Sequence, residues 1–209
     1  MSARIECNID VASLYSYIAY VDLMGNLDKL RSHGVEVEFH PILIAGINKL
    51  SGNKPPWLLP AKAKYIDSDV RRAASRLGMP APVTPDSFLE TRSFTASPQR
   101  AMLYVKANYP ARTFHAVLAR LFSAMWIPPH VNVCSDEGLA RVLAEAVASD
   151  GEPVFTDHDV RAVLDGRAGL KDSLASQTNK AVDQGAFGAP WFWVTNAKGE
   201  TDGFFGSDR

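Results

Sequence analysis

Apolar and polar positions alternate at the beginning of the chain. Residues 4–11 follow a period of two, which predicts a β-strand. Apolar side chains then recur at helical spacing through residues 16–31, and His33-Gly34 is a typical helix end. Residues 35–39 alternate again. The chain is therefore expected to open strand–helix–strand, a parallel crossover that is right-handed with few exceptions.

Helical patterns dominate the middle of the chain. Glycine and proline are frequent in residues 46–60, which predicts a loop. Beyond this loop, the spacing of apolar positions predicts helices over residues 61–77, 98–108, 111–126, 136–149, 157–164 and 170–184. Asp136 is the expected N-cap of the helix that it begins. Strand patterns return after Pro190, over residues 191–194 and 201–205.

Composition and charge limit the possible partners. The chain has 209 residues, 46% of them hydrophobic and 22% charged, which suits one large domain or one domain with a sizeable insertion. Its net charge of -1 gives no electrostatic reason to bind nucleic acid or an anionic membrane. There is no signal-peptide pattern, and no apolar run approaches the roughly 18 residues that a membrane helix needs. We expect a soluble, intracellular protein.

The cysteines and histidines show no spacing that is typical of chemistry. Cys7 and Cys134 form neither a C-x-x-C motif nor a zinc-site pattern, and no disulfide is expected between them. Cys7 alternates with apolar neighbours and is expected to be a buried small hydrophobe. The five histidines show no H-x-x-x-H or E-x-x-H spacing, so no metal is expected.

The most informative motif is Ser13-Leu14-Tyr15-Ser16, where the first strand gives way to the first helix. In thioredoxin-like folds a C-x-x-C motif does redox chemistry at this point. With serine at both positions, the chain cannot cycle a disulfide of its own. A helix N-terminus still stabilises an anion and lowers the pKa of a thiol placed there, and the Ser13 hydroxyl can donate to a ligand sulfur. Alternatively, Ser13 is only the N-cap of the helix.

A second motif, Phe187-Gly188-Ala189-Pro190, leads into a strand. X-Pro bonds adopt the cis form at low cost, and a cis bond here would leave the backbone of Ala189 facing outward, ready to pair with a bound peptide. The alternative is an ordinary edge-strand proline. Together the two motifs predict an α/β chain with a thioredoxin-like fold and a large all-helical insertion. Residues 1–50 and 186–209 would form the thioredoxin-like domain, and residues 51–185 the insertion.

Two further segments offer polar groups to a ligand. Residues 51–60 are rich in glycine and proline and therefore pre-set in shape, with Asn53 as donor and acceptor and Lys62 close by as a charge. The alternative is a surface linker. The final Gly206-Ser207-Asp208-Arg209 could hold a carboxylate through its backbone N–H groups and an ammonium through Asp208. A thioredoxin-like fold would close with a helix after this segment, and that helix is absent from the sequence.

Together these segments resemble the kappa class of glutathione transferases, which is similar to the bacterial 2-hydroxychromene-2-carboxylate isomerases and to the DsbA branch of the thioredoxin fold. The motifs that carry the resemblance are residues 10–16, residues 47–60 with Lys62, residues 185–190 and residues 205–209. The resemblance implies that Ser13 bonds the sulfur of glutathione. It implies further glutathione-binding positions at Leu14, Tyr15, Asn53, Lys62, Ala189, Pro190, Ser207 and Asp208. The chain departs from the family pattern at Leu14, where the family usually has proline.

The resemblance also implies roles for individual positions. Leu14 and Tyr15 would line the pocket of the sulfur. Ala189 would pair with the cysteinyl backbone of glutathione. Ser207 and Asp208 would bind its γ-glutamyl end.

The expected function is that of a glutathione transferase, in which the thiolate attacks a small hydrophobic electrophile. The serine is not expected to be the nucleophile, because no base beside Ser13 can be identified. Glutathione is then the co-substrate, the protein is a homodimer, and neither nucleic acid nor membrane is a partner. One alternative is an isomerase of the 2-hydroxychromene-2-carboxylate kind, with glutathione as its cofactor. The other is a non-catalytic thioredoxin-like binding module.

Overall fold

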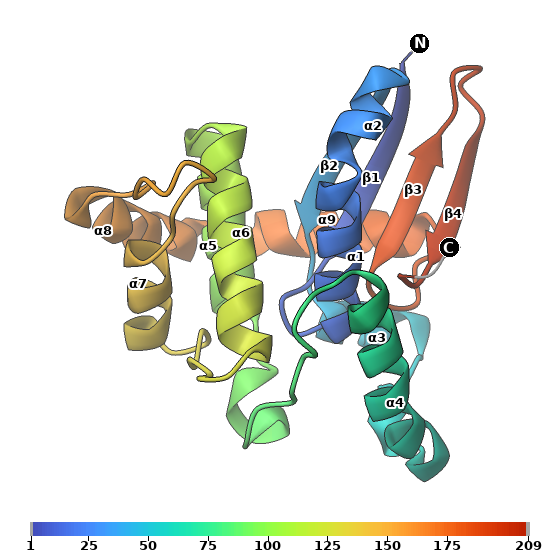
Figure 1. Cartoon of the computed structure of the whole chain (residues 1–209), viewed down its shortest axis with the longest axis horizontal. Helices are drawn as coiled ribbons and strands as arrows, with labels where there is room; N and C mark the ends of the chain where they lie inside the picture. The colour runs from blue at the N-terminus through green and yellow to red at the C-terminus, as the bar shows by residue number, and fades with distance from the viewer. Residues whose placement is uncertain (1, 208–209) are drawn as a thin grey trace. The chain divides into compact units, whose positions relative to one another are not determined.

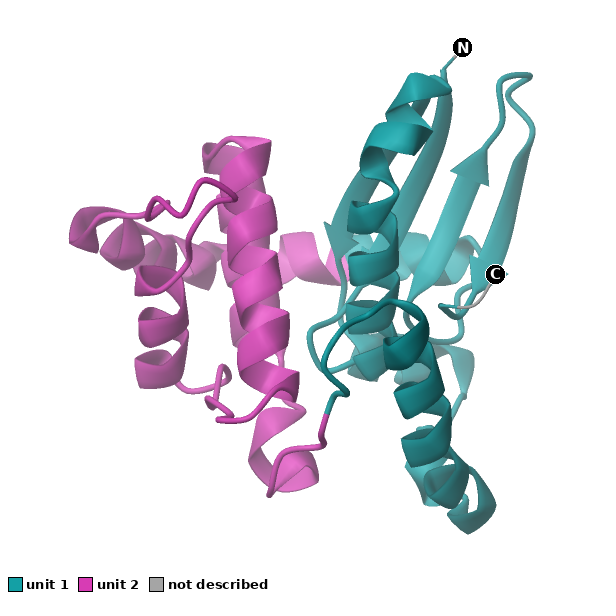
Figure 2. Ribbon diagram, viewed as in Figure 1, with its two compact units in different colours: residues 1–82, 177–209 teal, residues 83–176 magenta. Residues whose placement is uncertain are grey.

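The computed structural model describes residues 2–207, which fall into two compact units. One unit combines residues 1–82 with residues 177–209, and the other consists of residues 83–176 (Figure 2). The first unit contains the β-sheet, and the second is built from helices and their connections.

Within residues 2–207, a mixed sheet of four strands forms the centre of the first unit (Figure 1). The strands are β1 (Ala3–Ile9), β2 (Val35–Pro41), β3 (Trp191–Thr195) and β4 (Thr201–Phe205). Their order across the sheet is β2-β1-β3-β4. Strand β1 pairs parallel with β2 and antiparallel with β3, and β3 pairs antiparallel with β4. The predicted strands and the thioredoxin-like fold are confirmed.

Helices of the first unit flank this sheet. They are α1 (Leu14–Gly25), α2 (Leu27–Ser32), α3 (Ile44–Ser51), η1 (Pro56–Leu58), α4 (Pro60–Arg76) and the C-terminal half of α9 (Lys171–Asp183). The single helix predicted over residues 16–31 is wrong, because the chain interrupts it at Asn26. The Asn26 backbone has φ -107° and ψ 5°, and its side chain donates to the carbonyl of Asp22 at 2.9 Å. An asparagine that bonds the backbone in this way competes with a continuous helix.

The loop predicted over residues 46–60 is wrong in its first part, which belongs to α3. Ile47 is fully buried and packs in a cluster with Ile42 and Trp191, so the helix is stabilised by tertiary packing. The helix ends where Gly52 adopts φ 73°, a left-handed conformation that glycine reaches without steric cost. The glycine and proline content of the segment predicts a loop and therefore does not indicate this short helix.

The second unit is organised around α6. Its elements are η2 (Phe88–Arg92), α5 (Ala96–Asn108), α6 (Ala111–Trp126), α7 (Asp136–Ala144), α8 (Asp157–Gly166) and η3 (Arg167–Leu170). The α6 side chains of Leu121, Phe122 and Met125 are fully buried, as the apolar stripe of that helix predicts. The predicted cap of α7 is wrong: Ser135 caps it by accepting from the Gly138 N–H at 3.1 Å.

The boundaries of the two units differ from those expected for the helical insertion. Helix α4 lies in the expected insertion, residues 51–185, but it belongs to the unit of the sheet. Two side-chain contacts tie it to α1. The Tyr15 hydroxyl donates to Asp69 Oδ2 at 2.8 Å, and Arg76 donates to Asp22 Oδ2 at 2.9 Å. Sequence composition marks a loop before α4, but it does not indicate these bonds.

Both cysteines are free thiols, Cys7 fully buried and Cys134 partly exposed. Burial raises the pKa of the Cys7 thiol, so it stays protonated and behaves as a small apolar side chain. Among residues 2–207, no helix combines the length and the apolar character needed to cross a membrane.

Candidate functional site

The predicted turn from strand to helix forms around Ser13. The Ser13 backbone is extended (φ -97°, ψ 111°), and its hydroxyl oxygen accepts from the Ser16 N–H at 3.1 Å. Ser13 is therefore the N-cap of α1, and its side chain is buried. The first turn of α1 carries no acidic residue. The positive end of the helix dipole favours an anion at this end, where the Asp10 carboxylate already lies beside the turn.

A buried aspartate holds this turn in place. The Asp10 carboxylate accepts from the Ala12 N–H at 2.9 Å and from the Ile44 N–H at 2.8 Å. The Asp10 carbonyl accepts from the Ser13 N–H at 2.9 Å. One residue thereby fixes the beginnings of both α1 and α3, since hydrogen bonds to a carboxylate are stronger than neutral ones. The sequence pattern did not predict this role, because it places Asp10 inside the first strand, whereas β1 ends at Ile9.

The second predicted motif lies directly against the first. The peptide bond between Ala189 and Pro190 is cis. The Ser13 hydroxyl donates to the Ala189 carbonyl at 2.8 Å. In the described residues this hydroxyl bonds two backbone groups, the Ala189 carbonyl and the Ser16 N–H, and no side-chain base. The arrangement gives Ser13 no partner that would make it a nucleophile.

The segment around Gly188 is packed against the end of β4. The rings of Phe187 and Phe205 lie 4.5 Å apart between centroids. A Cβ atom on Gly188 would come within 2.6 Å of the Phe205 ring, so any larger residue here would require the ring or the loop to move. The Gly206 N–H also donates to the Pro190 carbonyl at 3.3 Å. These contacts bring the final predicted segment to the cis-proline.

Asn53 joins the same place from the chain after α3. Its side-chain nitrogen donates to the Phe187 carbonyl at 2.6 Å, and its side-chain oxygen accepts from the Lys54 N–H at 2.8 Å. The side chain of Asn53 is exposed, so it can also reach a ligand beside this loop. Segments around residues 13, 53, 189 and 206 therefore converge, as the sequence motifs predicted.

The remaining predicted glutathione-binding positions lie at different places relative to Ser13. Leu14 begins α1 and is half-buried, and Tyr15 follows it with its hydroxyl on Asp69. Ser207 is half-buried and lies two residues after the end of β4. Lys62 lies in the first turn of α4 with an exposed side chain, and its proximity to Ser13 stays a prediction. Asp208 lies outside the described residues.

Sequence similarity to known proteins extends over nearly the whole chain. The family model described as DSBA-like thioredoxin domain matches residues 4–209. This chain belongs to that family. Among curated proteins, the DsbA-like chain is 28% identical over 208 residues to "Glutathione S-transferase kappa 1" of Caenorhabditis elegans, covering 99% of this chain and 87% of the relative. It is 28% identical over 213 residues to the Homo sapiens protein of the same name, covering 98% and 86%.

Solved structures share the fold of this DsbA-like protein. A 2-hydroxychromene-2-carboxylate isomerase aligns with a TM-score of 0.75 at 19% identity, covering 99% of this chain and 90% of that one. The cytosolic disulfide reductase DsbM from Pseudomonas aeruginosa with GSH aligns with a TM-score of 0.59 at 18% identity, covering 97% and 89%. This chain has S-x-x-S at the start of α1, where a thioredoxin-like redox motif would have C-x-x-C.

Proposed function

We propose that this DsbA-like protein is a glutathione transferase that holds the thiolate of glutathione against the N-terminus of α1. The observation that carries the proposal is the placement of the Ser13 hydroxyl, at a helix start and beside the Ala189 carbonyl. The similarity to kappa glutathione S-transferases over nearly the full chain supports it. The absence of a cysteine from the S-x-x-S fits chemistry on a ligand's thiol.

The hydrogen bond between Ser13 and Ala189 suggests how glutathione binding would prepare the hydroxyl. The cysteinyl N–H of glutathione is expected to donate to the Ala189 carbonyl, as one strand adds to another. That bond would replace the one from Ser13 and leave the Ser13 hydroxyl able to turn toward the sulfur. The carbonyl keeps a donor throughout, so the exchange leaves no buried acceptor unpaired.

The expected effect on the thiol can be estimated. A hydrogen bond to a charged group contributes about 1.5–3 kcal/mol. Since one pKa unit corresponds to about 1.4 kcal/mol, the Ser13 hydroxyl is expected to lower the pKa of the bound thiol by about one to two units. The N-terminus of α1 acts in the same direction. Together they would keep a useful fraction of the sulfur ionised at neutral pH.

In the proposed reaction the sulfur lone pair forms a bond to an electrophilic carbon. In an aromatic substitution the leaving group departs with its bonding electrons. In a conjugate addition the resulting carbanion takes a proton from water. The protein's part is to bind, orient and ionise the thiol, and Ser13 forms no covalent bond.

The other predicted positions would bind the rest of the tripeptide and the electrophile. Asn53 and Lys62 would contact glutathione from one side, and Ser207 with Asp208 would hold its γ-glutamyl end. Leu14 and Tyr15 would line the pocket that holds the sulfur, and a small hydrophobic electrophile would bind beside it. The exposed apolar side chains in the segment of Asn53 (Leu50, Trp57, Leu58) suit such an electrophile. A homodimer and the absence of a metal from the reaction belong to the same proposal.

A second candidate is a glutathione-dependent isomerase, favoured by the alignment with the 2-hydroxychromene-2-carboxylate isomerase over 99% of this chain. The two candidates differ in whether glutathione is consumed. The transferase is tested by conjugation of glutathione to 1-chloro-2,4-dinitrobenzene. Both the absorbance of the product and the consumption of the thiol are measured. Tight glutathione binding without consumption favours the isomerase. A folded protein that fails to bind glutathione in calorimetry is a non-catalytic thioredoxin-like module, and the proposal is then wrong.

A further inference from the structure

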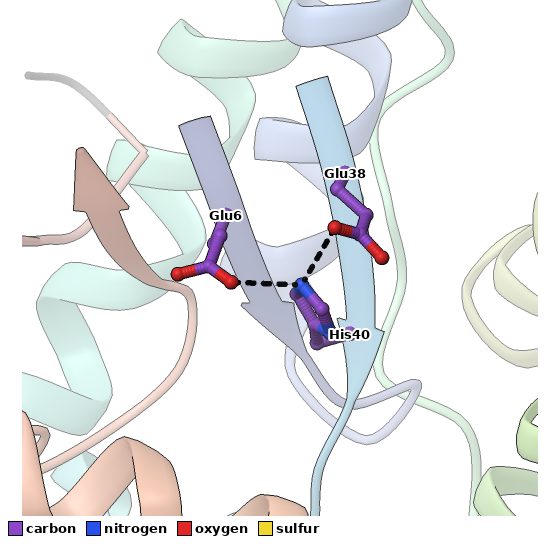
Figure 3. A group of neighbouring side chains, drawn as sticks. All are labelled: Glu6, Glu38 and His40. Atoms are coloured by element: carbon purple, nitrogen blue, oxygen red, sulfur yellow. Dashed lines mark ion pairs between the residues drawn. The ribbon is translucent and has the colours of Figure 1, made fainter. Parts of the chain in front are cut away.

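Two neighbouring strands place three metal-ligating side chains on one face of the sheet. In the parallel pairing of β1 with β2, Glu6 lies opposite Glu38, and Asn8 lies opposite His40. Residues two apart along a strand share a face, so Glu38 and His40 point to the side on which Glu6 lies. Figure 3 shows the His40 ring directed between the two carboxylates.

The distances from the His40 imidazole to the two carboxylates match those between ligands of one metal ion. His40 Nε2 lies 3.5 Å from Glu6 Oε1 and 3.5 Å from Glu38 Oε2. The three potential ligand atoms all lie within 4.8 Å of one another. Zinc bonds to nitrogen and oxygen are about 2.1 Å long, which places neighbouring ligands of a tetrahedron about 3.4 Å apart. The two separations from His40 Nε2 therefore match this geometry, and the two carboxylate oxygens lie within 4.8 Å of each other.

We propose that Glu6, Glu38 and His40 bind a first-row divalent cation, with Zn²⁺ the best match. Imidazole and carboxylate ligands suit this class of ion, and three protein ligands leave a fourth position for water. The side chains of Glu6 and His40 are only 7% and 9% exposed, while that of Glu38 is 41% exposed. The buried pair gives a rigid base, and the open side at Glu38 gives the ion a route in.

The charges around Glu6 show what the ion would replace. Arg4 Nη2 lies 3.0 Å and Lys180 Nζ lies 3.2 Å from the same oxygen, Glu6 Oε1. Two monocations thus lie beside the Glu6 carboxylate, and one dication would bring the same positive charge to the cluster. The side chains of Arg4 and Lys180 are 45% and 52% exposed, so both can turn into solvent when an ion enters.

Gln177 supplies the outer contact that metal-bound histidines usually have. Its side-chain nitrogen Nε2 lies 3.4 Å from His40 Nδ1, the ring nitrogen that does not face the carboxylates. With the amide oxygen turned to accept from Nδ1–H, the Nε2 lone pair faces the ion. A metal ion bound here would cross-link β1 and β2. The histidine spacing of the chain does not reveal this site, because Glu6 comes from a different strand.

The test consists of two titrations of chelator-treated protein. Zn²⁺ binding is measured by calorimetry, and Co²⁺ binding is measured by the visible absorption of the bound ion. We expect one equivalent to bind and Co²⁺ to give the intense bands of tetrahedral coordination. Glu38→Gln should weaken binding by at least about tenfold. Glu36→Gln is the matched control, because Glu36 is exposed, on the same strand, and outside the cluster.

Two more variants distinguish a metal site from a purely structural ion-pair network. Lys180→Gln removes a competing cation and should tighten Zn²⁺ binding several-fold, whereas an ion-pair network alone would show no such gain. His33→Gln removes an exposed imidazole and should change nothing. Lack of stoichiometric binding by the folded wild-type protein, or equal loss in Glu36→Gln and Glu38→Gln, overturns the proposal. The site uses no residue of the proposed glutathione site, so neither result depends on the other.

Discussion

The Ser13 hydroxyl donates to the Ala189 carbonyl at 2.8 Å, joining residues 176 positions apart in the chain. The bond unites the start of α1 with the loop that ends in the cis peptide bond before Pro190. The only hydroxyl proton of Ser13 is donated to this carbonyl, and the hydroxyl oxygen accepts from the Ser16 N–H. A ligand that donates its own N–H to the Ala189 carbonyl would therefore leave the Ser13 hydroxyl able to donate to the ligand's sulfur.

Asn53→Asp should weaken glutathione binding. The aspartate can still accept from the Lys54 N–H, but it cannot donate to the Phe187 carbonyl, and its charge repels that oxygen. We expect glutathione affinity to fall by about tenfold, the equivalent of one lost hydrogen bond. Calorimetry measures this. As a control, Asn196→Asp alters an asparagine in the β3–β4 turn and should leave the affinity as it is; an unchanged affinity in Asn53→Asp would contradict the proposed role.

Gly188→Ala should disturb the cis-proline loop. The added methyl group meets the Phe205 ring at 2.6 Å, so the loop or the ring must move. Such overpacking costs about 1–3 kcal/mol of unfolding free energy, and we expect glutathione affinity to fall with it. Urea unfolding and calorimetry check the two effects. Gly169→Ala, where nothing lies within 4 Å of the new methyl, should be close to neutral. Similar losses in both variants would rule out the contact with Phe205 as the cause.

Tyr15 and Asp69 should be energetically coupled, because their hydrogen bond ties α1 to α4. Tyr15→Phe removes the hydroxyl alone and should lower the unfolding free energy by about 1–2 kcal/mol. A double-mutant cycle with Asp69→Ala should give a coupling of about 1 kcal/mol or more. Tyr65→Phe, on the exposed face of α4, serves as the control. Strict additivity of Tyr15→Phe and Asp69→Ala would show that the bond contributes nothing in solution.

The capping box of α8 should make stability depend on pH. Hydrogen bonds from Thr156 lower the pKa of Asp159 below its ordinary value. Because the folded-state pKa is the lower one, this carboxylate stabilises the fold above its unfolded pKa of about 3.9, and the contribution is lost as pH falls through the folded value. Thr156→Ala should cost about 1 kcal/mol at neutral pH and progressively less in acid. Urea unfolding across this range checks the trend, which a constant difference would refute.

Much of the fold could be predicted because local patterns encode it. The strands follow a period of two, and α6 begins and ends at the predicted residues 111 and 126. Features that depend on a single competing contact could not be predicted. The break at Asn26 arises from its bond to Asp22, and α3 forms because Ile47 is buried by distant parts of the chain.

The site shows the same division. The motifs around Ser13 and Ala189 could be identified because each follows a local rule about helix starts or proline. Their partners could not, because Asp69 and Phe187 are brought to Tyr15 and Asn53 by the tertiary fold. The role of Asp10 could not be predicted either, because the alternation of residues 4–11 places it inside a strand, whereas β1 ends at Ile9.

The most direct test of the central idea is the pKa of the thiol in bound glutathione, measured from the ultraviolet absorbance of the thiolate across a pH titration of the complex. The wild-type protein should lower this pKa well below that of free glutathione. Ser13→Ala should return it upward by about one to two units, and Ser13→Thr, which keeps a hydroxyl, should restore most of the effect. An identical thiol pKa in the wild-type protein and Ser13→Ala would contradict the account.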